Sequence, residues 1–242
     1  MSERVVAGVD GCRGGWIAVV RRPGEAPAIA VLASFAALLA DLPEDAVVAV
    51  DMPIGLPETS GPRGRAPERA VRPLLSGRQS SVFSIPSRSA VYAPDYQEAR
   101  RLALATSSPP KSVAKQAFHI FPRIRELDGI LVANPALAER VIEVHPELAF
   151  WRLNGERAMA LAKKVRNRAS EPGLAERVAL LERCGYERAF LEAEPPRGAG
   201  RDDVLDAAVA ALVAERHAEG KARPFPDPFD RDAFGLPMAI WA

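Results

Sequence analysis

The sequence predicts a mixed α/β fold, and three observations support this prediction. Short runs rich in β-branched residues, at 4–10, 15–21 and 28–33, are separated by Gly and Pro turns, which is typical of an antiparallel meander. A short helical segment and a wholly apolar run come next, and this strand, helix, strand order favours a buried strand that runs parallel to an earlier one. Apolar residues at helical spacing then dominate the rest of the chain. We therefore expect one mixed sheet packed with helices.

The elements that follow the meander can be assigned in order. Ser34 precedes the segment FAALLADL (35–42) and is a favourable N-cap for a short helix. The apolar run AVVAVDMP (46–53) is the expected parallel strand. Residues 53–95 are rich in Pro, Gly, Ser and Arg and are too long for a simple connection, so we expect a functional loop or a mobile flap there.

Helical periodicity marks most of the remaining chain. Apolar residues recur at helical spacing in 97–105 and 113–132, although Pro122 must kink or split the second segment. The segment 140–153, with the sequence RVIEVHPELAFWRL, predicts a strand followed by a helix that begins at a proline.

The last third of the chain predicts helices and a proline-rich tail. Residues 156–190 predict two charged helices broken near 172–173. The Ala-rich segment 201–220 predicts a helix that ends at Gly220. The tail 223–242 is expected to pack onto the core or onto a partner.

Charge and cysteine content exclude several classes of protein. With 32 Lys and Arg against 31 Asp and Glu the formal net charge is +1, so any nucleic-acid contact has to come from local patches. Cys12 and Cys184 lie far apart in the chain, which argues for a reducing compartment and against a disulfide framework or a Cys-based metal site. No window is apolar enough to span a membrane. We expect a cytoplasmic protein that does not associate with a membrane.

Two carboxylates end apolar strands. Asp10 closes the first strand and Asp51 closes the expected parallel strand, at the sheet edge where ligands of open α/β sheets bind. If these strands are neighbours, about 4.8 Å apart, both carboxylates point into one small volume and repel each other. A hard divalent cation such as Mg²⁺ would relieve that repulsion. The alternative is that both acids are turn formers before Gly and Pro.

The Ala-rich helix adds further acids near its start. Asp203 and Asp206 lie one helical turn apart on the same face and could complete a set of metal ligands. Asp202 and Asp203 could instead cap the helix and interact with its dipole. The sequence alone leaves both roles open.

The segment EVHPE carries three more polar candidates. Glu143 and His145 are expected on one face of the sheet, and Glu147 is expected to start the next helix. Either glutamate could complete a metal shell or orient an attacking water, or could pair with Arg123 or Arg125. His145 is a hydrogen-bonded core residue more often than a base.

Basic residues and serines in the long loop suggest a phosphate clamp. The segment GRQSSVFSIPSR supplies guanidinium groups and hydroxyls suited to phosphate, but it could equally be a solvated flap. Lysines at the start of the long helix and near 163 are further candidates, although surface lysines usually serve solubility. The candidate substrate-binding residues are Arg78, Ser80, Ser81, Arg88, Lys111 and Lys163.

Several of these motifs together resemble a known family. They are GVDGCRGGW, VDMPIGLP, SSVFSIPSR, KQAFHIFPRIRELD, EVHPELAFWRLNG and DDVLDAAVAA, spread over about 7–215. The chain resembles the predicted RNase H-like nucleases of domain-of-unknown-function family 429, in the ribonuclease H-like superfamily and close to its Holliday-junction resolvase (RuvC-like) branch. The resemblance implies a five-stranded mixed sheet of order 3-2-1-4-5 with helices on both faces. It also implies one domain over 1–242, with an insertion of loop and helices at about 53–138.

The resemblance also implies a catalytic site. Asp10, Asp51 and Asp206 match the superfamily's metal-binding acids, and Asp203 lies one turn earlier. They would hold two Mg²⁺ or Mn²⁺ ions that activate water for attack on a phosphodiester of DNA or RNA. Asp10 would bridge the ions and Asp203 would hold a ligand water. The superfamily commonly has Glu where this chain has the shorter Asp51, and this difference bears on the spacing of the ions. Resolvase-type cleavage would further require a homodimer.

Two other functions fit the same residues. A non-catalytic module that binds a nucleotide or RNA could retain this fold. An actin-like or sugar-kinase-like phosphotransferase shares the strand order and the first-strand aspartate, but those proteins normally duplicate the domain, and this chain has no second DxGxxxG pattern. Metal binding separates the module from the two enzymes, and ATP hydrolysis separates the enzymes from each other.

Overall fold

The computed structural model describes residues 4–165 and 168–242. Its main sheet has the strand order β3-β2-β1-β4-β5-β9-β8. Strands β1, β2 and β3 form the antiparallel meander, whereas β1, β4, β5 and β9 run parallel and β8 is antiparallel to β9. The strands are β1 (Val6–Cys12), β2 (Gly15–Arg21), β3 (Ala28–Leu32), β4 (Val47–Val50), β5 (Val141–Val144), β8 (Pro224–Arg231) and β9 (Pro237–Trp241).

The mixed α/β class and the strand order 3-2-1-4-5 are thus confirmed, and this order is consistent with an RNase H-like fold. The sheet is wider than expected, because within the described residues it has seven strands rather than five. The two additional strands come from the tail, which packs onto the core. The tail was not expected to form strands because it is rich in proline. Within a sheet, proline is confined to edge strands, first strand positions and bulges.

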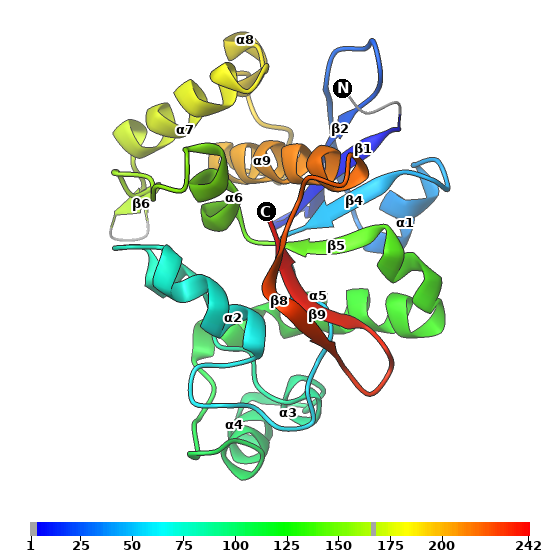
Figure 1. Ribbon diagram of the computed structural model, residues 1–242, viewed down its shortest axis with the longest axis vertical. Helices are drawn as coiled ribbons and strands as arrows, with labels where there is room; N and C mark the ends of the chain where they lie inside the picture. Colours follow the sequence, from blue (N-terminus) through cyan, green and yellow to red (C-terminus); the bar gives the residue numbers. More distant parts are fainter. Residues whose placement is uncertain (1–3, 166–167) are drawn as a thin grey trace.

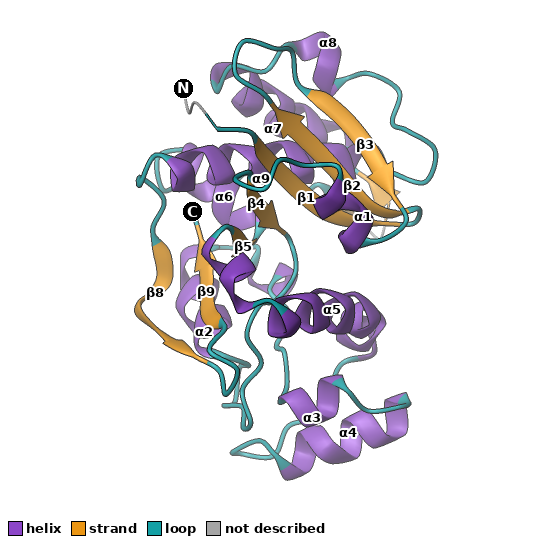
Figure 2. Cartoon of the chain, turned by 90° about the vertical axis from the view of Figure 1, so that its right-hand side faces the viewer, coloured by secondary structure: helices purple, strands orange, loops and turns teal. Residues whose placement is uncertain are grey.

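Helices cover both faces of the sheet (Figure 2). Buried residues of α6, α7 and α9 form one core with one face, and those of α1 and α5 form a second core with the other. The helices are α1 (Phe35–Ala40), α2 (Ala66–Val71), α3 (Arg88–Val91), α4 (Tyr96–Ala105), α5 (Lys115–Ala133), α6 (Pro146–Leu153), α7 (Glu171–Arg183), α8 (Arg188–Leu191) and α9 (Arg201–Ala218). Short 3₁₀ turns lie at Arg72–Leu74, Gln79–Ser81 and Pro135–Glu139.

Helix α9 lies directly on β1, and Gly8 makes this approach possible (Figure 1). A Cβ atom at Gly8 would come within 2.0 Å of the carbonyl oxygen of Ala207 and the amide nitrogen of Ala211. The fully buried alanines of α9 are Ala207, Ala208, Ala210, Ala211 and Ala214. Small residues on both elements therefore bring the start of α9 close to the end of β1, where Asp10 lies.

One local expectation needs correction, and a second is narrowed to one of its two alternatives. Residues 156–190 do not form two helices broken near 172–173. Instead a small hairpin, β6 (Lys164–Val165) and β7 (Arg168–Ala169), precedes α7. Pro172 lies in the first turn of α7, where its missing N–H costs nothing, so it marks a helix start rather than a break. Of the two effects expected of Pro122, splitting the helix does not occur, because α5 continues through it from Lys115 to Ala133, and a kink stays a prediction.

The segment at about 53–138 contains α2 to α5. In Figure 1, α3 and α4 lie at the bottom of the view, whereas α2 and α5 lie at the height of β8 and β9. That it is an insertion in a single domain stays a prediction. Across the described parts of the chain, none of the helices combines the length and apolar character that a membrane crossing needs.

Candidate metal centre

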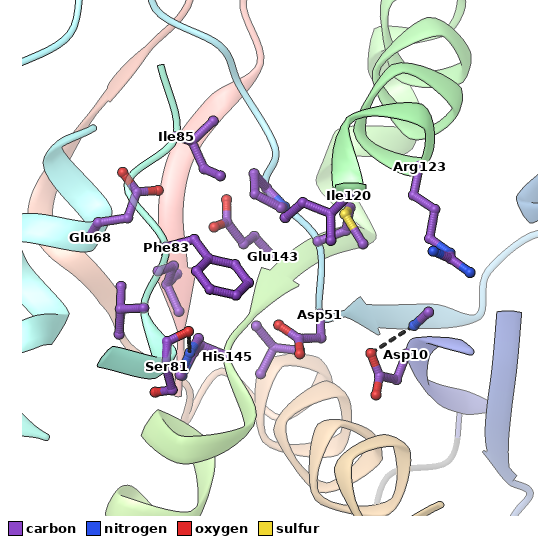
Figure 3. Close-up of a pocket in the computed structure, with 16 residues that line it drawn as sticks. Asp10, Asp51, Glu68, Ser81, Phe83, Ile85, Ile120, Arg123, Glu143 and His145 are labelled. Carbon is purple, nitrogen blue, oxygen red and sulfur yellow. Dashed lines mark hydrogen bonds between the residues drawn. The ribbon is translucent and has the colours of Figure 1, made fainter. Parts of the chain in front are cut away.

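Strands β1 and β4 place Asp10 and Asp51 side by side. Val9 and Val50 are register partners in the parallel ladder, and the backbone N–H of Asp51 donates to the carbonyl of Val9 at 2.9 Å. Asp10 lies in β1 itself, and its Oδ1 accepts a hydrogen bond from the Gly11 N–H at 2.7 Å. The two acids therefore end adjacent strands at one edge of the sheet (Figure 3).

Asp206 joins them from the second turn of α9. It is 3% exposed. One carboxylate oxygen each of Asp10, Asp51 and Asp206 lies within 4.8 Å of the others, and these three residues could hold a metal ion. The convergence depends on the close packing of α9 on β1.

Burial and mutual repulsion raise the pKa values of these acids. Burial, together with the charge of Asp206, raises the pKa of Asp51 to about 8. Burial and the charges of Asp51 and Asp206 hold the pKa of Asp10 well above its usual range. Burial also raises the pKa of Asp206, although Lys163 opposes the shift. Without a metal ion, the cluster therefore retains protons near neutral pH.

The hydrogen bonding of Asp206 fits a cation site. Its Oδ2 accepts from the Lys163 ammonium, whereas its Oδ1 is buried without a hydrogen-bond partner among the described residues. A buried carboxylate oxygen without a partner costs free energy. A bound cation would satisfy it, and carboxylate oxygens are the ligands that Mg²⁺ and Mn²⁺ prefer.

Lys163 is fixed beside the carboxylates by its backbone. Its carbonyl accepts from the Ser170 N–H at 2.9 Å. A Cβ atom at Gly173 would lie 2.0 Å from the carbonyl oxygen of Ala162, so this turn packs tightly on the start of α7. Burial alone would lower the pKa of Lys163, but the charges of Asp206 and Asp10 outweigh it and the pKa is raised. Lys163 is therefore a built-in positive charge of the cluster.

The other acids at the start of α9 have different partners. Asp203 Oδ2 accepts from the Gly200 N–H at 2.8 Å, as a helix cap. Asp202 pairs with the Lys164 ammonium at 2.5 Å. Asp203 as a ligand or a holder of water stays a prediction.

Glu143 belongs to a buried ionic network with Arg65. The fully buried Arg65 guanidinium donates to Glu143 Oε1 at 2.5 Å and to Glu68 Oε1 at 2.7 Å. It also donates to the carbonyls of Ile54 and Gly55, and the Ile54 N–H donates to Glu143 Oε2 at 2.8 Å. Burial raises the pKa of Glu143 to about 7, although Arg65 opposes the shift. The network fixes the loop that directly follows Asp51.

Glu147 has a comparable structural partner. Its Oε1 accepts from the fully buried Arg177 at 2.6 Å, and Arg177 also donates to the carbonyls of Leu161 and Gly173. The partners of both glutamates are thus Arg65 and Arg177, rather than the suggested Arg123 and Arg125. Arg123 and Arg125 instead donate to the carbonyls of Cys12 and Ala93. Metal ligation by Glu143 and Glu147 stays a prediction.

A cavity of about 160 Å³ opens beside Asp10 and Asp51. Arg123 borders it at the Asp10 end, and Phe83 and Ile120 border it farther along, as Figure 3 shows. Sequence reasoning missed Phe83 and Ile120, because an apolar side chain has no local mark that separates a pocket wall from a core position.

The candidate phosphate-binding residues are scattered. Within 4–165 and 168–242, Ser81 lines the cavity, and the ammonium of Lys163 reaches Asp206. Arg78 donates to the carbonyl of Ala160 at 2.7 Å, Ser80 is exposed, and Lys111 donates to the carbonyl of Pro62 at 3.0 Å.

Arg88, the other clamp candidate, is held by two acids. It pairs with Asp128 at 2.5 Å and with Asp232 at 2.8 Å. Asp232 also accepts from the Leu56 N–H. Phosphate binding by Arg88 and by the other clamp candidates stays a prediction.

His145 follows β5 and lines the same cavity. Its Nε2 lies 3.4 Å from the carbonyl oxygen of Ser81, and Nδ1 is buried without a partner in the described structure. Burial lowers the pKa of His145 to about 4, so the imidazole is neutral at physiological pH.

Comparison with known proteins identifies the family of the chain. Searches of curated proteins and of solved structures found no match. One family model, described as "Protein of unknown function (DUF429)", matches residues 8–231, which is most of the chain. The model spans the motifs that carry Asp10, Asp51 and Asp206. The protein therefore belongs to the DUF429 family.

Proposed function

We propose that this protein is a metal-dependent phosphodiester hydrolase that acts on nucleic acid, an RNase H-like nuclease that uses Mg²⁺ or Mn²⁺. The observation that carries the proposal is the convergence of Asp10, Asp51 and Asp206, together with a buried Asp206 oxygen that has no partner in the described residues. When bound, the metal would lower the pKa of a coordinated water and neutralise charge that develops on the phosphate.

The residues around the cluster suit a phosphodiester. Asp10 and Asp51 would bind the metal from the strand ends, and Asp206 would bind it with its Oδ1 while Lys163 fixes its Oδ2. The Arg123 guanidinium borders the cavity near Asp10, and a guanidinium is well suited to hold a phosphate oxygen.

The number of ions depends on Lys163. Three ionised carboxylates and one ammonium leave a local charge of about −2, which a single divalent ion neutralises. A second ion, as the superfamily resemblance implies, would have to share Asp206 with the Lys163 ammonium. We therefore propose that the protein in its described conformation binds one ion tightly, and that a second ion requires Lys163 to move.

Removal of the Lys163 charge is expected to strengthen metal binding. The ammonium repels a divalent cation at the same carboxylates, so Lys163→Met should bind Mn²⁺ at least about tenfold more tightly in calorimetric titration. Lys164→Met is the matched control, because that neighbouring lysine pairs with Asp202. The Mn²⁺ affinity of this variant should equal that of the wild type. Equal or weaker binding by Lys163→Met would contradict the proposed role of the ammonium.

The proposed activity is tested with a panel of substrates. The protein with Mn²⁺ is expected to cleave at least one of single-stranded DNA, single-stranded RNA, duplex DNA or a four-way junction. Chelation of the metal and the Asp10→Asn substitution should each abolish cleavage. Failure to bind Mn²⁺ would favour the non-catalytic binding module, and Mn²⁺ binding without cleavage of any of these substrates would contradict the nuclease. Metal-dependent ATP hydrolysis would favour the phosphotransferase.

A further inference from the structure

We propose that the cavity beside the carboxylates is a specificity pocket that takes one planar ring of nucleobase size, attached to the phosphate that the metal site attacks. This inference rests on the proposed function and names its substrate class: a nucleotide unit whose base is unpaired. It concerns the end of the cavity away from Asp10, which the proposed hydrolysis leaves without a role.

The two ends of the cavity differ in chemistry. Asp10, Asp51 and Arg123 border one end, as Figure 3 shows, and these groups suit a phosphate and a cation. Phe83 and Ile85 border the other end. A ligand with a charged phosphate joined to an apolar, planar group matches both ends at once.

The size of the cavity limits the ligand to one ring system. Its volume is about 160 Å³, well below the roughly 300–1,000 Å³ of sites that enclose drug-sized ligands. A base pair, with two ring systems held in one plane, is too large to be enclosed in this cavity. The base must therefore be unpaired, as in single strands, in chain ends or after extrusion from a duplex.

Phe83 gives the pocket a stacking surface. Its side chain is only partly buried and projects into the cavity between Glu143 and His145. Aromatic side chains bind successive or single bases by stacking on their flat faces, with little dependence on base identity. Ile120 borders the cavity as well and adds apolar contact.

Most polar groups at the Phe83 end are engaged already, whereas the buried Nδ1 of His145 has no partner among the described residues. Glu143 and Glu68 both accept from Arg65. Their negative charges also disfavour a second phosphate at this end. The pocket therefore offers contact area and a ring face but few free hydrogen-bonding groups. We expect it to require a base but to discriminate weakly among bases.

The direct test is ligand binding to the Mn²⁺-loaded protein by calorimetric titration. Thymidine 5′-monophosphate and deoxyribose 5-phosphate have the same phosphate and sugar ring, and the base of the first takes the place of the anomeric hydroxyl of the second. Thymidine 5′-monophosphate should bind about 10- to 100-fold more tightly, the range expected for stacking of one base. Equal affinities for the two ligands would overturn the pocket proposal.

Two variants locate the effect. Phe83→Ala removes the ring face, and Ile120→Phe fills the cavity without a change of charge. In each variant, thymidine 5′-monophosphate should bind no more tightly than deoxyribose 5-phosphate, so that the ratio of the two affinities is near one. The affinity for deoxyribose 5-phosphate should stay unchanged. Phe229→Ala is the control, because Phe229 is also a partly buried phenylalanine but packs on Trp241 between β8 and β9 of the main sheet. A ratio that persists in both pocket variants would also refute the proposal.

Cleavage assays separate this inference from the proposed function. The p-nitrophenyl ester of thymidine 5′-monophosphate and its base-free analogue share one scissile bond. If neither is cleaved but the binding ratio is observed, the hydrolase proposal fails and the pocket stands. If both are cleaved at equal kcat/KM and bind equally, the hydrolase stands and the pocket fails.

Discussion

Replacement of Asp51 with asparagine is expected to weaken Mn²⁺ binding by more than about 100-fold. The carboxylate is one of three that converge within 4.8 Å, and even the outer partners of metal ligands typically contribute about 10- to 100-fold in affinity. Calorimetric titration measures the change directly. Asp202→Asn is the control, because Asp202 lies on the same helix as Asp206 but pairs with Lys164. Similar losses in the two variants would contradict the assignment of Asp51.

The same substitution should stabilise the metal-free protein, with a defined pH dependence. The pKa of Asp51 is raised in the folded state, to about 8, from its ordinary value of 3.8. Between these values the folded state binds more protons than the unfolded state, so the free energy of unfolding falls as the pH rises, by up to about 1.4 kcal/mol per pH unit for one proton. Below about pH 4 this effect is absent, and above about pH 8 it is complete.

Asp51→Asn removes this titration, so the melting temperature of the metal-free variant should fall less between pH 4 and pH 8 than that of the wild type. At pH 8 the variant should melt higher by several degrees, since about 1 kcal/mol corresponds to roughly 2–4 °C in a domain of this size. Thermal melts in the presence of a chelator make the measurement. If the metal-free variant melts at a lower temperature than the wild type at pH 8, the ionised Asp51 carboxylate does not destabilise the folded protein.

Loss of the Arg65 guanidinium is expected to have the largest effect on stability. Arg65→Met leaves the buried carboxylates of Glu143 and Glu68 without their cation and leaves the Ile54 and Gly55 carbonyls without a donor. Removal of one partner from a buried ion pair typically costs about 3–5 kcal/mol. Urea denaturation gives the free energy of unfolding. Because this network holds the loop after Asp51, Mn²⁺ affinity should fall as well.

Two further variants test the cause of this loss. Arg101→Met removes an exposed guanidinium that pairs with Glu98, and exposed pairs contribute only about 0–1 kcal/mol. Glu143→Gln in the Arg65→Met background removes one buried charge, so it should restore part of the stability. A loss in Arg65→Met no larger than that in Arg101→Met would mean that the buried network contributes little.

The parts of the fold that could be predicted are those marked by patterns of neighbouring residues in the sequence. The meander, the parallel strand before Asp51 and the helix that carries Asp206 follow from apolar periodicity and from turn and cap residues. Adjacent strands and their carboxyl ends then bring Asp10 and Asp51 together by topology alone. The approach of Asp206 was implied by a family resemblance, and in the structure it depends on the small residues of α9 and on Gly8.

The parts that escaped prediction depend on pairings between distant segments. Arg65 and Glu143 are 78 residues apart in the chain, and nothing near either residue marks the other as its partner. Arg88 likewise pairs with Asp128 and Asp232. The strands of the tail were missed because three prolines in β8 contradict strand propensity, whereas pairing with β9 stabilises the strand in the folded protein.

Those same prolines affect how copies of the protein could meet. Strand β8 forms one border of the main sheet, and Pro224, Pro226 and Pro228 lack the N–H groups that an incoming strand would need. Such residues protect sheet borders from unwanted self-association. Strand β3 forms the opposite border and contains no proline. If two copies pair strands to extend the sheet, they are therefore expected to pair through β3. A charged residue introduced into β3 is expected to prevent that pairing.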